Sequence, residues 1–418
     1  MAHETSSNYS WQSRAESAIH HGALTNSKRA QNHVKGVYPT HITKGFGATL
    51  YDTNGKQYID YICALGANLL GYANAYINKA IETQLKNGNI HSLPTTLEVI
   101  AAERLKSLFP YVDKWRFLKT GSDACDSAIK MARSAQSNLL VNGKYVSKKW
   151  VLSEGYHGHD CLFVGLTDPH LGVEPDRFIL PLNEDSRRLF LNEAAAVIIE
   201  PIITDLSEKR IKWIQELKED CKKAGCLLIF DEVITGFRFP KFSFSNYTGI
   251  VPDIIVLGKA IANGHALSAV GTKCGLNFNQ EWFVSSTFAG ETIAFAALLE
   301  TINQLIEKPL EAFFMEANRF QEDLNKVLPD GIKLEGYGTR GSFVGDENIL
   351  NLFKQETCRA GILFGPSFFY NYCHKQHEFL VLSGVKNIAM RINNNEVNLE
   401  GEPPVKAFAQ KVRENDRS

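Results

Sequence analysis

Two short apolar runs near the middle of the chain constrain its fold more than any other feature. Residues 226–230 (CLLIF) end in the acids Asp231 and Glu232, and residues 254–257 (IIVL) end in Gly258 and Lys259. Short unbroken apolar runs are typical of strands that are buried on both faces of a parallel sheet. Ligands of such sheets bind beyond the carboxyl ends of the strands. The sequence therefore predicts that Asp231 and Lys259 lie at one ligand-binding edge.

An aspartate and a lysine in this arrangement match the chemistry of enzymes that use pyridoxal 5'-phosphate (PLP). The lysine forms a Schiff base with the aldehyde, and the carboxylate keeps the ring nitrogen protonated. Each residue also has a simpler interpretation, because an aspartate after a strand is often a helix N-cap and a lysine there is often only solvated. The pair, together with Gly258, favours the cofactor hypothesis.

The pattern around these runs predicts the architecture. Strands alternate with helices from residue 115 to 275, which indicates an α/β fold with a mostly parallel sheet. Short strands with an Asn54-Gly55 hairpin occupy residues 37–61, with Asp52 expected on the surface. Residues 1–35 are expected to form an irregular polar arm. Helical patterns cover residues 75–87, 95–109, 207–223, 291–307 and 310–327. We predict residues 1–70 as an arm plus part of a small domain, 71–308 as a large PLP-binding domain, and 309–418 as a small C-terminal α+β domain.

Composition excludes several classes of protein. The chain has 418 residues, 44% hydrophobic residues and a net charge of −1, so nothing indicates a nucleic-acid or anionic-membrane partner. No apolar run approaches the ~20 residues of a membrane helix, and the polar N-terminus lacks the apolar core of a signal peptide. The eight cysteines form no CxxC pair, which favours a reducing, cytoplasmic setting. Four of them are expected to be small core residues: Cys63, Cys161, Cys226 and Cys274.

Two further segments carry groups that could bind a phosphate. Gly121 and Ser122 lie at a predicted strand-to-helix turn, where backbone N–H groups and the helix dipole attract anions. A plain serine N-cap is the alternative. The hydroxyl-rich stretch 285–292 contains Thr287 and predicts either a second phosphate contact or a capping loop. Neither a P-loop nor a GxGxxG motif after a strand is present.

The stretch 155–160 (GYHGHD) allows two interpretations. His157 and His159 could share a metal ion. In a PLP site, Tyr156 or His157 would instead lie against the flat face of the ring, where aromatic stacking adds roughly 0.5–1.5 kcal/mol. Arg238 could bind a substrate carboxylate, but we expect it on the surface.

Taken together, these segments resemble the class III (ω-type) aminotransferases of PLP fold type I, and in style the glutamate-1-semialdehyde aminomutase branch. The resemblance covers about residues 30 to 390. It is carried by GATLYDTNGKQYIDY, GSDACDSAIKMAR, YHGHD, IIEP, IFDEVITGFR, GKAIANGH and STFAGE.

The resemblance implies a large sheet domain with a small α+β domain, a homodimer, and roles for individual residues. Lys259 would form the Schiff base with PLP, and Asp231 would bind the pyridine nitrogen. Val233 would pack on one face of the ring and Tyr156 on the other.

The phosphate of PLP would be held from two chains. Gly121 and Ser122 would bind it from the same subunit. Thr287 would reach the phosphate in the neighbouring subunit, because active sites of this family lie at the dimer interface. The substrates implied are a small-molecule amino donor and a carbonyl acceptor, with no metal.

The chain departs from the aminomutase pattern around the substrate. Residues 262–265 are ANGH where aminomutases carry a glycine-rich stretch, residues 34–38 contain no arginine, and Asp205 replaces an asparagine. The ANGH variant resembles enzymes that aminate sugar carbonyls. We therefore expect a cytoplasmic aminotransferase with a sugar-like or polyhydroxylated acceptor. An intramolecular aminomutase is the alternative, and a metal-dependent hydrolase at His157 and His159 or an inactive scaffold are hypotheses from other classes.

Overall fold

The computed structural model describes residues 8–136, 139–141, 144–146, 150–159, 177–180, 183–276, 278 and 282–405. Within these residues the chain forms two compact units. One comprises the described residues up to Asn74 together with those from Met315 onward, and the other is Ala75–Phe314. As functional domains, the boundaries predicted at residues 70 and 308 remain a proposal.

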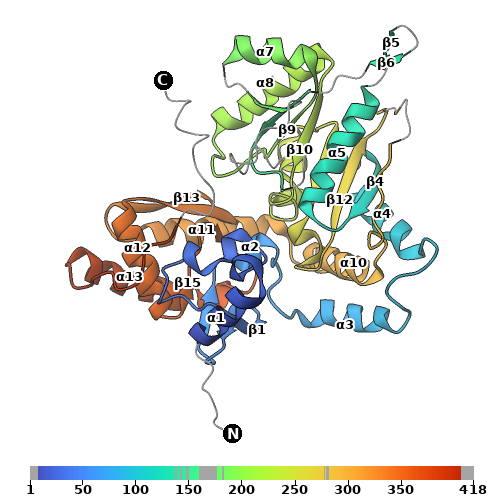
Figure 1. The fold of residues 1–418 in the computed structure, drawn as a ribbon. Coiled ribbons are helices and arrows are strands. Elements are labelled where there is room, and N and C mark those ends of the chain that lie inside the picture. The colour runs from blue at the N-terminus through green and yellow to red at the C-terminus, as the bar shows by residue number, and fades with distance from the viewer. Residues whose placement is uncertain are drawn as a thin grey trace. The chain divides into compact units, whose positions relative to one another are not determined.

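The unit Ala75–Phe314 is built around a seven-stranded sheet (Figure 1). β12 pairs antiparallel with β4 and β11, and the other neighbouring strands that the structure describes pair in parallel. This arrangement confirms the predicted α/β fold with a mostly parallel sheet. In spatial order the strands are β4 (Val112–Leu118), β12 (Ser268–Lys273), β11 (Ile254–Leu257), β10 (Leu227–Asp231), β9 (Ala194–Ile199), β7 (Trp150–Glu154) and β8 (Arg177–Ile179).

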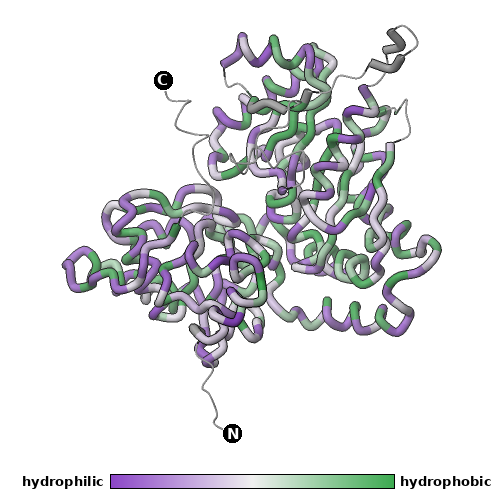
Figure 2. Tube along the Cα trace, viewed as in Figure 1, coloured by the Kyte–Doolittle hydropathy of each residue, from purple (hydrophilic) through white to green (hydrophobic). Residues whose placement is uncertain are grey.

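Most helices of this unit lie where the periodicity predicts them, while α7 and α9 were not predicted. α5 packs on the central strands through small residues, among them Ala124, Ala128 and Ala132, which bring the helix close to the sheet. Figure 2 shows hydrophobic residues concentrated in the strands and in α10. The helices are α3 (Ala75–Leu85), α4 (Thr96–Leu108), α5 (Gly121–Ala135), α7 (Glu184–Glu193), α8 (Glu208–Ala224), α9 (Phe244–Thr248) and α10 (Thr292–Glu307), and the chain continues into α11 (Leu310–Asn325). A short hairpin joins β5 (Leu139–Val141) to β6 (Lys144–Val146).

The other unit contains two small sheets with helices around them. A four-stranded sheet has the order β1 (Ile42–Phe46), β2 (Thr49–Asp52), β3 (Gln57–Asp60) and β15 (Ile362–Leu363), and a three-stranded sheet has the order β13 (Ile332–Tyr337), β14 (Arg340–Gly345) and β16 (Phe368–Phe369). Its helices are α1 (Asn8–Ala18), α2 (Cys63–Gly66), α12 (Glu347–Arg359) and α13 (Glu378–Asn393).

The polar N-terminal segment is more regular than predicted. Instead of an irregular arm, the described part begins with α1 and continues through short 3-10 turns. Within α1, the Gln12 side chain donates to Glu16 one helical turn later at 2.7 Å, and the Arg14 guanidinium lies 4.0 Å from the centre of the Trp11 ring. Such local pairs stabilise a helix without an apolar periodicity, and the sequence pattern therefore missed it.

The Asn54-Gly55 hairpin is confirmed, but Asp52 is not exposed. β2 and β3 pair antiparallel across the turn. The Asp52 side chain is buried and accepts hydrogen bonds from the N–H groups of Asn54 (2.8 Å) and Lys56 (2.9 Å) and from the Tyr58 hydroxyl (3.1 Å). An aspartate that bonds the backbone of its own turn is satisfied without water.

The described cysteines are free thiols. Cys63 and Cys226 are buried as expected, Cys274 is exposed because it follows the end of β12, and Cys161 lies outside the described residues. In the part of the chain that the structure describes, no helix combines the length and the apolar character needed to span a membrane.

Candidate active site

The sheet brings Asp231 and Lys259 to one edge. β10 and β11 are parallel neighbours with Asp231 paired to Val256, and β11 ends two residues before Lys259. Lys259 begins a short 3-10 turn (Lys259–Ala262) and has a φ of 46°, a left-handed conformation that is uncommon outside glycine. Its charge helps to lower the pKa of Asp231. Both residues therefore lie where parallel α/β sheets bind their ligands.

The Asp231 carboxylate is buried among hydrogen-bond donors. Oδ2 lies 2.8 Å from Nδ1 of His157 and accepts from the Cys125 thiol at 3.3 Å, while Oδ1 accepts from the N–H of Val233 at 3.0 Å. Burial alone would raise the pKa of this carboxyl. The hydrogen bond and charge of His157, the Val233 N–H and the Lys259 ammonium outweigh burial and lower the pKa below its usual value. Asp231 is therefore a buried carboxylate that stays ionised.

His157 is held in place from the opposite side. Its Nε2 lies 3.1 Å from the carbonyl oxygen of Glu154, the last residue of β7. The Glu154 carboxylate in turn forms a bidentate pair with Arg210, at 3.0 and 3.2 Å, and the Arg210 guanidinium lies 4.5 Å from the centre of the Trp213 ring. The end of β7 is thereby tied to α8.

α5 begins at Gly121, where the sequence predicts a strand-to-helix turn that could bind an anion. Thr120 is the N-cap, because its hydroxyl accepts from the N–H of Asp123 at 3.1 Å and the Asp123 carboxylate accepts from the N–H of Thr120 at 3.0 Å. The alternative of a serine cap is wrong. Ser122 is buried in the first turn, and its hydroxyl accepts from the N–H of His159 at 3.2 Å. The positive end of α5 thus faces the loop 155–159.

Glycines let these segments approach each other closely. A Cβ at Gly158, whose φ is 109°, would lie 2.2 Å from the Ser122 hydroxyl oxygen. A Cβ at Gly121 or at Gly258 would lie 3.1 or 3.2 Å from a methyl group of Val233. Val233 therefore packs between the α5 turn and the residue before Lys259.

Tyr156 also belongs to the loop 155–159, and it is exposed to solvent. Its N–H donates to the buried carboxylate of Glu200 at 2.9 Å, while the residue as a whole is 46% exposed. Since His157 is directed to Asp231 and Glu154, Tyr156 remains the candidate to stack on the cofactor.

Thr287 lies five residues before the start of α10. It is exposed and lines a groove of about 880 Å³ with residues of α4, β4 and the loop 285–290. The end of that loop is anchored beside the turn, since Lys119 and Glu291 form an ion pair at 2.7 Å. Thr287 itself therefore faces open space, as a contact to another chain would require.

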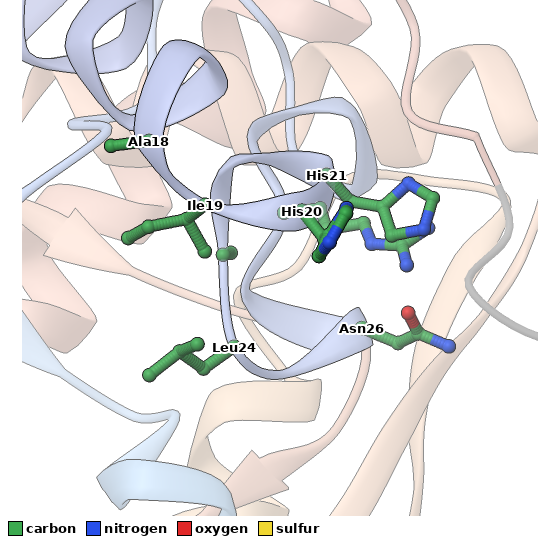
Figure 3. Close-up of a pocket in the computed structure, with 8 residues that line it drawn as sticks. Ala18, Ile19, His20, His21, Leu24 and Asn26 are labelled. Carbon is green, nitrogen blue, oxygen red and sulfur yellow. The ribbon is translucent and has the colours of Figure 1, made fainter.

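A second hollow, of about 450 Å³, lies in the other unit (Figure 3). It is lined by residues 18–21, 23, 24, 26 and 29, which include His20 and His21. None of the predicted site residues belongs to it.

The expectation that Arg238 lies on the surface is wrong. Arg238 is fully buried between Phe237 and Phe239, rather than on the surface, because the segment after β10 folds back into the unit. The Glu232 carboxylate organises this segment by accepting from the N–H groups of Phe244 (2.7 Å) and Ser245 (2.9 Å).

His157 and His159, which the sequence offered as an alternative metal pair, do not come together as ligands among the described residues. Among the described residues, the potential ligands that gather are Cys125, His157 and Asp231, and His159 is not one of them. The sequence-based prediction of the site did not include Cys125. It lies three residues after Ser122, about one helical turn, so the helical period could have placed it on the same buried face.

This geometry is that of a fold type I PLP enzyme. The fold is similar to the solved structure of the FumI protein from Sphingopyxis sp. MTA144 with PLP. The two match over 95% of this chain and 98% of that one, with a TM-score of 0.82 and 22% identity. A β-phenylalanine aminotransferase from Variovorax paradoxus matches over 93% of this chain and 94% of its own, with a TM-score of 0.78 and 20% identity.

Comparisons of the sequence identify the family to which the chain belongs. The family model for class-III aminotransferases matches residues 30–180 and 174–335, so the chain belongs to the class III aminotransferase family. Glutamate-1-semialdehyde 2,1-aminomutase 2 of Anoxybacillus flavithermus is 30% identical over 83% of this chain and 88% of its own length. Glutamate-1-semialdehyde 2,1-aminomutase of Fusobacterium nucleatum is 32% identical over 69% of this chain and 70% of its own length.

The cofactor of this enzyme is PLP, and the residues present fit it. A buried carboxylate with a lowered pKa suits a pyridinium nitrogen, a lysine lies at the same sheet edge, and an α-helix begins beside them with a glycine. A side chain at Gly121 or Gly258 would press against Val233, at 3.1 and 3.2 Å from its methyl groups.

Gly158→Ala should weaken PLP binding, because the new Cβ would collide with Ser122 in the first turn of α5 and push the anion-binding turn away. We expect a loss of at least tenfold in PLP affinity, measured by titration of the apoenzyme. Gly249→Ala is the matched control: its φ of 75° is also left-handed, but no atom lies within 4 Å of the new Cβ. Equal PLP affinity in the two variants would show that the contact at Gly158 is unimportant.

Proposed function

We propose that this class III enzyme is an aminotransferase that moves an amino group from an amino-acid donor to a carbonyl acceptor. The observation that carries the proposal is the placement of Asp231 and Lys259 at the carboxyl ends of the adjacent parallel strands β10 and β11, beside the start of α5. A lysine and an ionised buried carboxylate at one edge are the two groups that PLP chemistry requires from a protein.

When bound, PLP supplies a ring that stabilises negative charge on the substrate carbon that carries the amino group. Lys259 would hold the cofactor covalently through Nζ, and once free its amine would serve as the acid and base that moves a proton during the transfer. Asp231 holds the proton on the ring nitrogen. A carboxylate with a lowered pKa performs this role because it remains charged at neutral pH.

The remaining site residues bind and orient. The N–H groups of Gly121 and Ser122 at the positive end of α5 bind the phosphate. Val233, fixed between Gly121 and Gly258, packs on one face of the ring, and Tyr156 stacks on the other.

We propose a polyhydroxylated, sugar-like acceptor. The residues 262–265 (ANGH) differ from the glycine-rich stretch of the aminomutases. Burial lowers the pKa of His265 even though the Glu291 carboxylate raises it, so this imidazole is neutral at pH 7. A neutral imidazole offers one donor and one acceptor, which suits hydroxyl groups.

A glutamate-1-semialdehyde-type aminomutase is the second candidate. It is favoured by the 30–32% identity to the aminomutases of Anoxybacillus flavithermus and Fusobacterium nucleatum. Against it stands the absence of an arginine in residues 34–38 and the ANGH segment.

The enzyme would act as a cytoplasmic homodimer. Exposed Thr287, on the wall of a groove, supports a site completed by the neighbouring subunit. The free thiols among the described cysteines fit a reducing compartment.

Lys259→Ala should abolish the covalent link to PLP, because no other amine takes its place at the end of β11. After borohydride reduction and digestion, mass spectrometry should find the cofactor on the peptide of Lys259 in the wild type and nowhere in the variant. Lys273→Ala is the control. Lys273 is the last residue of β12 and pairs with Asp253, which precedes the first residue of β11, so it lies at the opposite end of β11 from Lys259. A labelled peptide that persists in Lys259→Ala would contradict the assignment.

The reaction type can be decided with one substrate at a time. An aminotransferase given only an amino donor should convert its PLP to the amine form once and stop, which absorption spectroscopy records. Multiple turnovers of glutamate 1-semialdehyde into its isomer, without a second substrate, would instead establish the aminomutase.

Thr287→Ala should weaken PLP binding and dimer association together, because one hydrogen bond to a charged phosphate contributes roughly 1.5–3 kcal/mol. That corresponds to about a ten- to hundredfold loss of PLP affinity. Sedimentation with and without PLP should show that the cofactor strengthens the wild-type dimer more than the variant. Thr83→Ala, at an exposed hydroxyl bonded within α3, is the control. A monomer that binds PLP as tightly as the dimer would refute the shared site.

A further inference from the structure

Cys125 contacts the residue that we assign to the ring nitrogen of PLP. It lies on α5, almost completely buried, and its thiol donates to Asp231 Oδ2 at 3.3 Å. Burial, and then the charge and hydrogen bond of Asp231, raise the pKa of this thiol well above its usual value. The sulfur therefore keeps its proton, and the S–H group is a permanent donor toward the carboxylate.

His157 is the second donor to the same oxygen. Its Nε2 faces the carbonyl of Glu154, which can only accept, so Nε2 carries a hydrogen. Its Nδ1 lies 2.8 Å from the carboxylate of Asp231, and because an ionised carboxylate can only accept, the hydrogen of this contact belongs to Nδ1. The two contacts assign the ring as a donor on both sides.

The donors leave one direction on Asp231 open. A carboxylate has about four lone-pair positions, two on each oxygen. His157 and Cys125 take both positions on Oδ2, and the N–H of Val233 takes one on Oδ1. The remaining position, on Oδ1, is where a further N–H can bind.

We propose that Cys125 is a positioning residue, which together with His157 fills Oδ2 of Asp231 and so directs Oδ1 toward the ring nitrogen of PLP. The inference rests on the proposed role of Asp231. A thiol suits this task because it is a weak donor. The hydrogen bond from the thiol restricts the rotation of the carboxylate, and it withdraws little of the negative charge that the pyridinium needs.

The first test is the S–H stretching band in the infrared spectrum of the PLP-bound enzyme, assigned by its loss in Cys125→Ala. The proposal requires a band shifted to lower wavenumber by the bond to the carboxylate, and a return toward the value of a free thiol in Asp231→Asn. A wild-type band already at the free-thiol value would overturn it. So would stoichiometric Zn²⁺ bound by purified apoenzyme, since the donor set Cys125, His157 and Asp231 would then hold a metal.

The second test uses PLP labelled with ¹⁵N in the ring. In Cys125→Ala the pH at which the ring nitrogen loses its proton should fall, and PLP affinity should drop by about three- to tenfold, the effect of one hydrogen bond. Cys125→Ser, which restores a donor, should recover part of both. Cys221→Ala, at an equally buried cysteine of α8, should change neither.

The outcomes separate the two hypotheses. If Asp231→Asn leaves the ¹⁵N resonance of the ring unchanged, the proposed role of Asp231 fails. If Asp231→Asn shifts that resonance while Cys125→Ala leaves it unchanged, or raises the pH of deprotonation, only the positioning role of Cys125 fails.

Discussion

The buried, ionised carboxylate of Asp231 is the interaction on which the rest of the site depends. Burying a charge is expensive unless it is paired and hydrogen-bonded. Here the compensation comes from three separate segments: Cys125 on α5, His157 in the loop after β7, and the backbone of Val233. Each donor has to be in place for the charge to be tolerated, so the conformations of these segments are coupled to one carboxylate.

The parallel sheet makes this coupling possible. Because β10, β11, β9 and β7 run in the same direction, the segments that follow them emerge at one edge. The start of α5 lies against the same edge through the contact of Ser122 with the loop 155–159. The start of α5 at Gly121 thus meets Asp231 and Lys259, each of which follows it by more than a hundred residues in the chain. The glycines at positions 121, 158 and 258 keep these segments close enough to share one small cofactor.

The Cys125 contact links the first turns of α5, where we propose that the phosphate binds, to Asp231, which we assign to the ring nitrogen. Ser122 and Cys125 belong to the same first turns of α5, one bonded to the loop 155–159 and the other to Asp231. A displacement of this helix would therefore alter the anion-binding turn and the carboxylate at once. In energetic terms such residues should not behave additively, because they share partners.

The sequence by itself determined the sheet, the order of its strands and helices, and the candidates Asp231, Lys259, Gly121 and Ser122, because apolar runs and helical periods are local properties. It could not place residues whose surroundings come from distant segments. Asp52 turned inward to bond its own hairpin, Arg238 was buried when the chain after β10 folded back, and Cys274 was left exposed beyond β12. Cys125 and His157 became partners of Asp231 only once α5 was packed on the sheet and β7 lay one strand away from β10, with β9 between them. Only the tertiary structure decided these environments, because burial and hydrogen-bond partners depend on which segments meet in space and not on the residue's own neighbours in the chain.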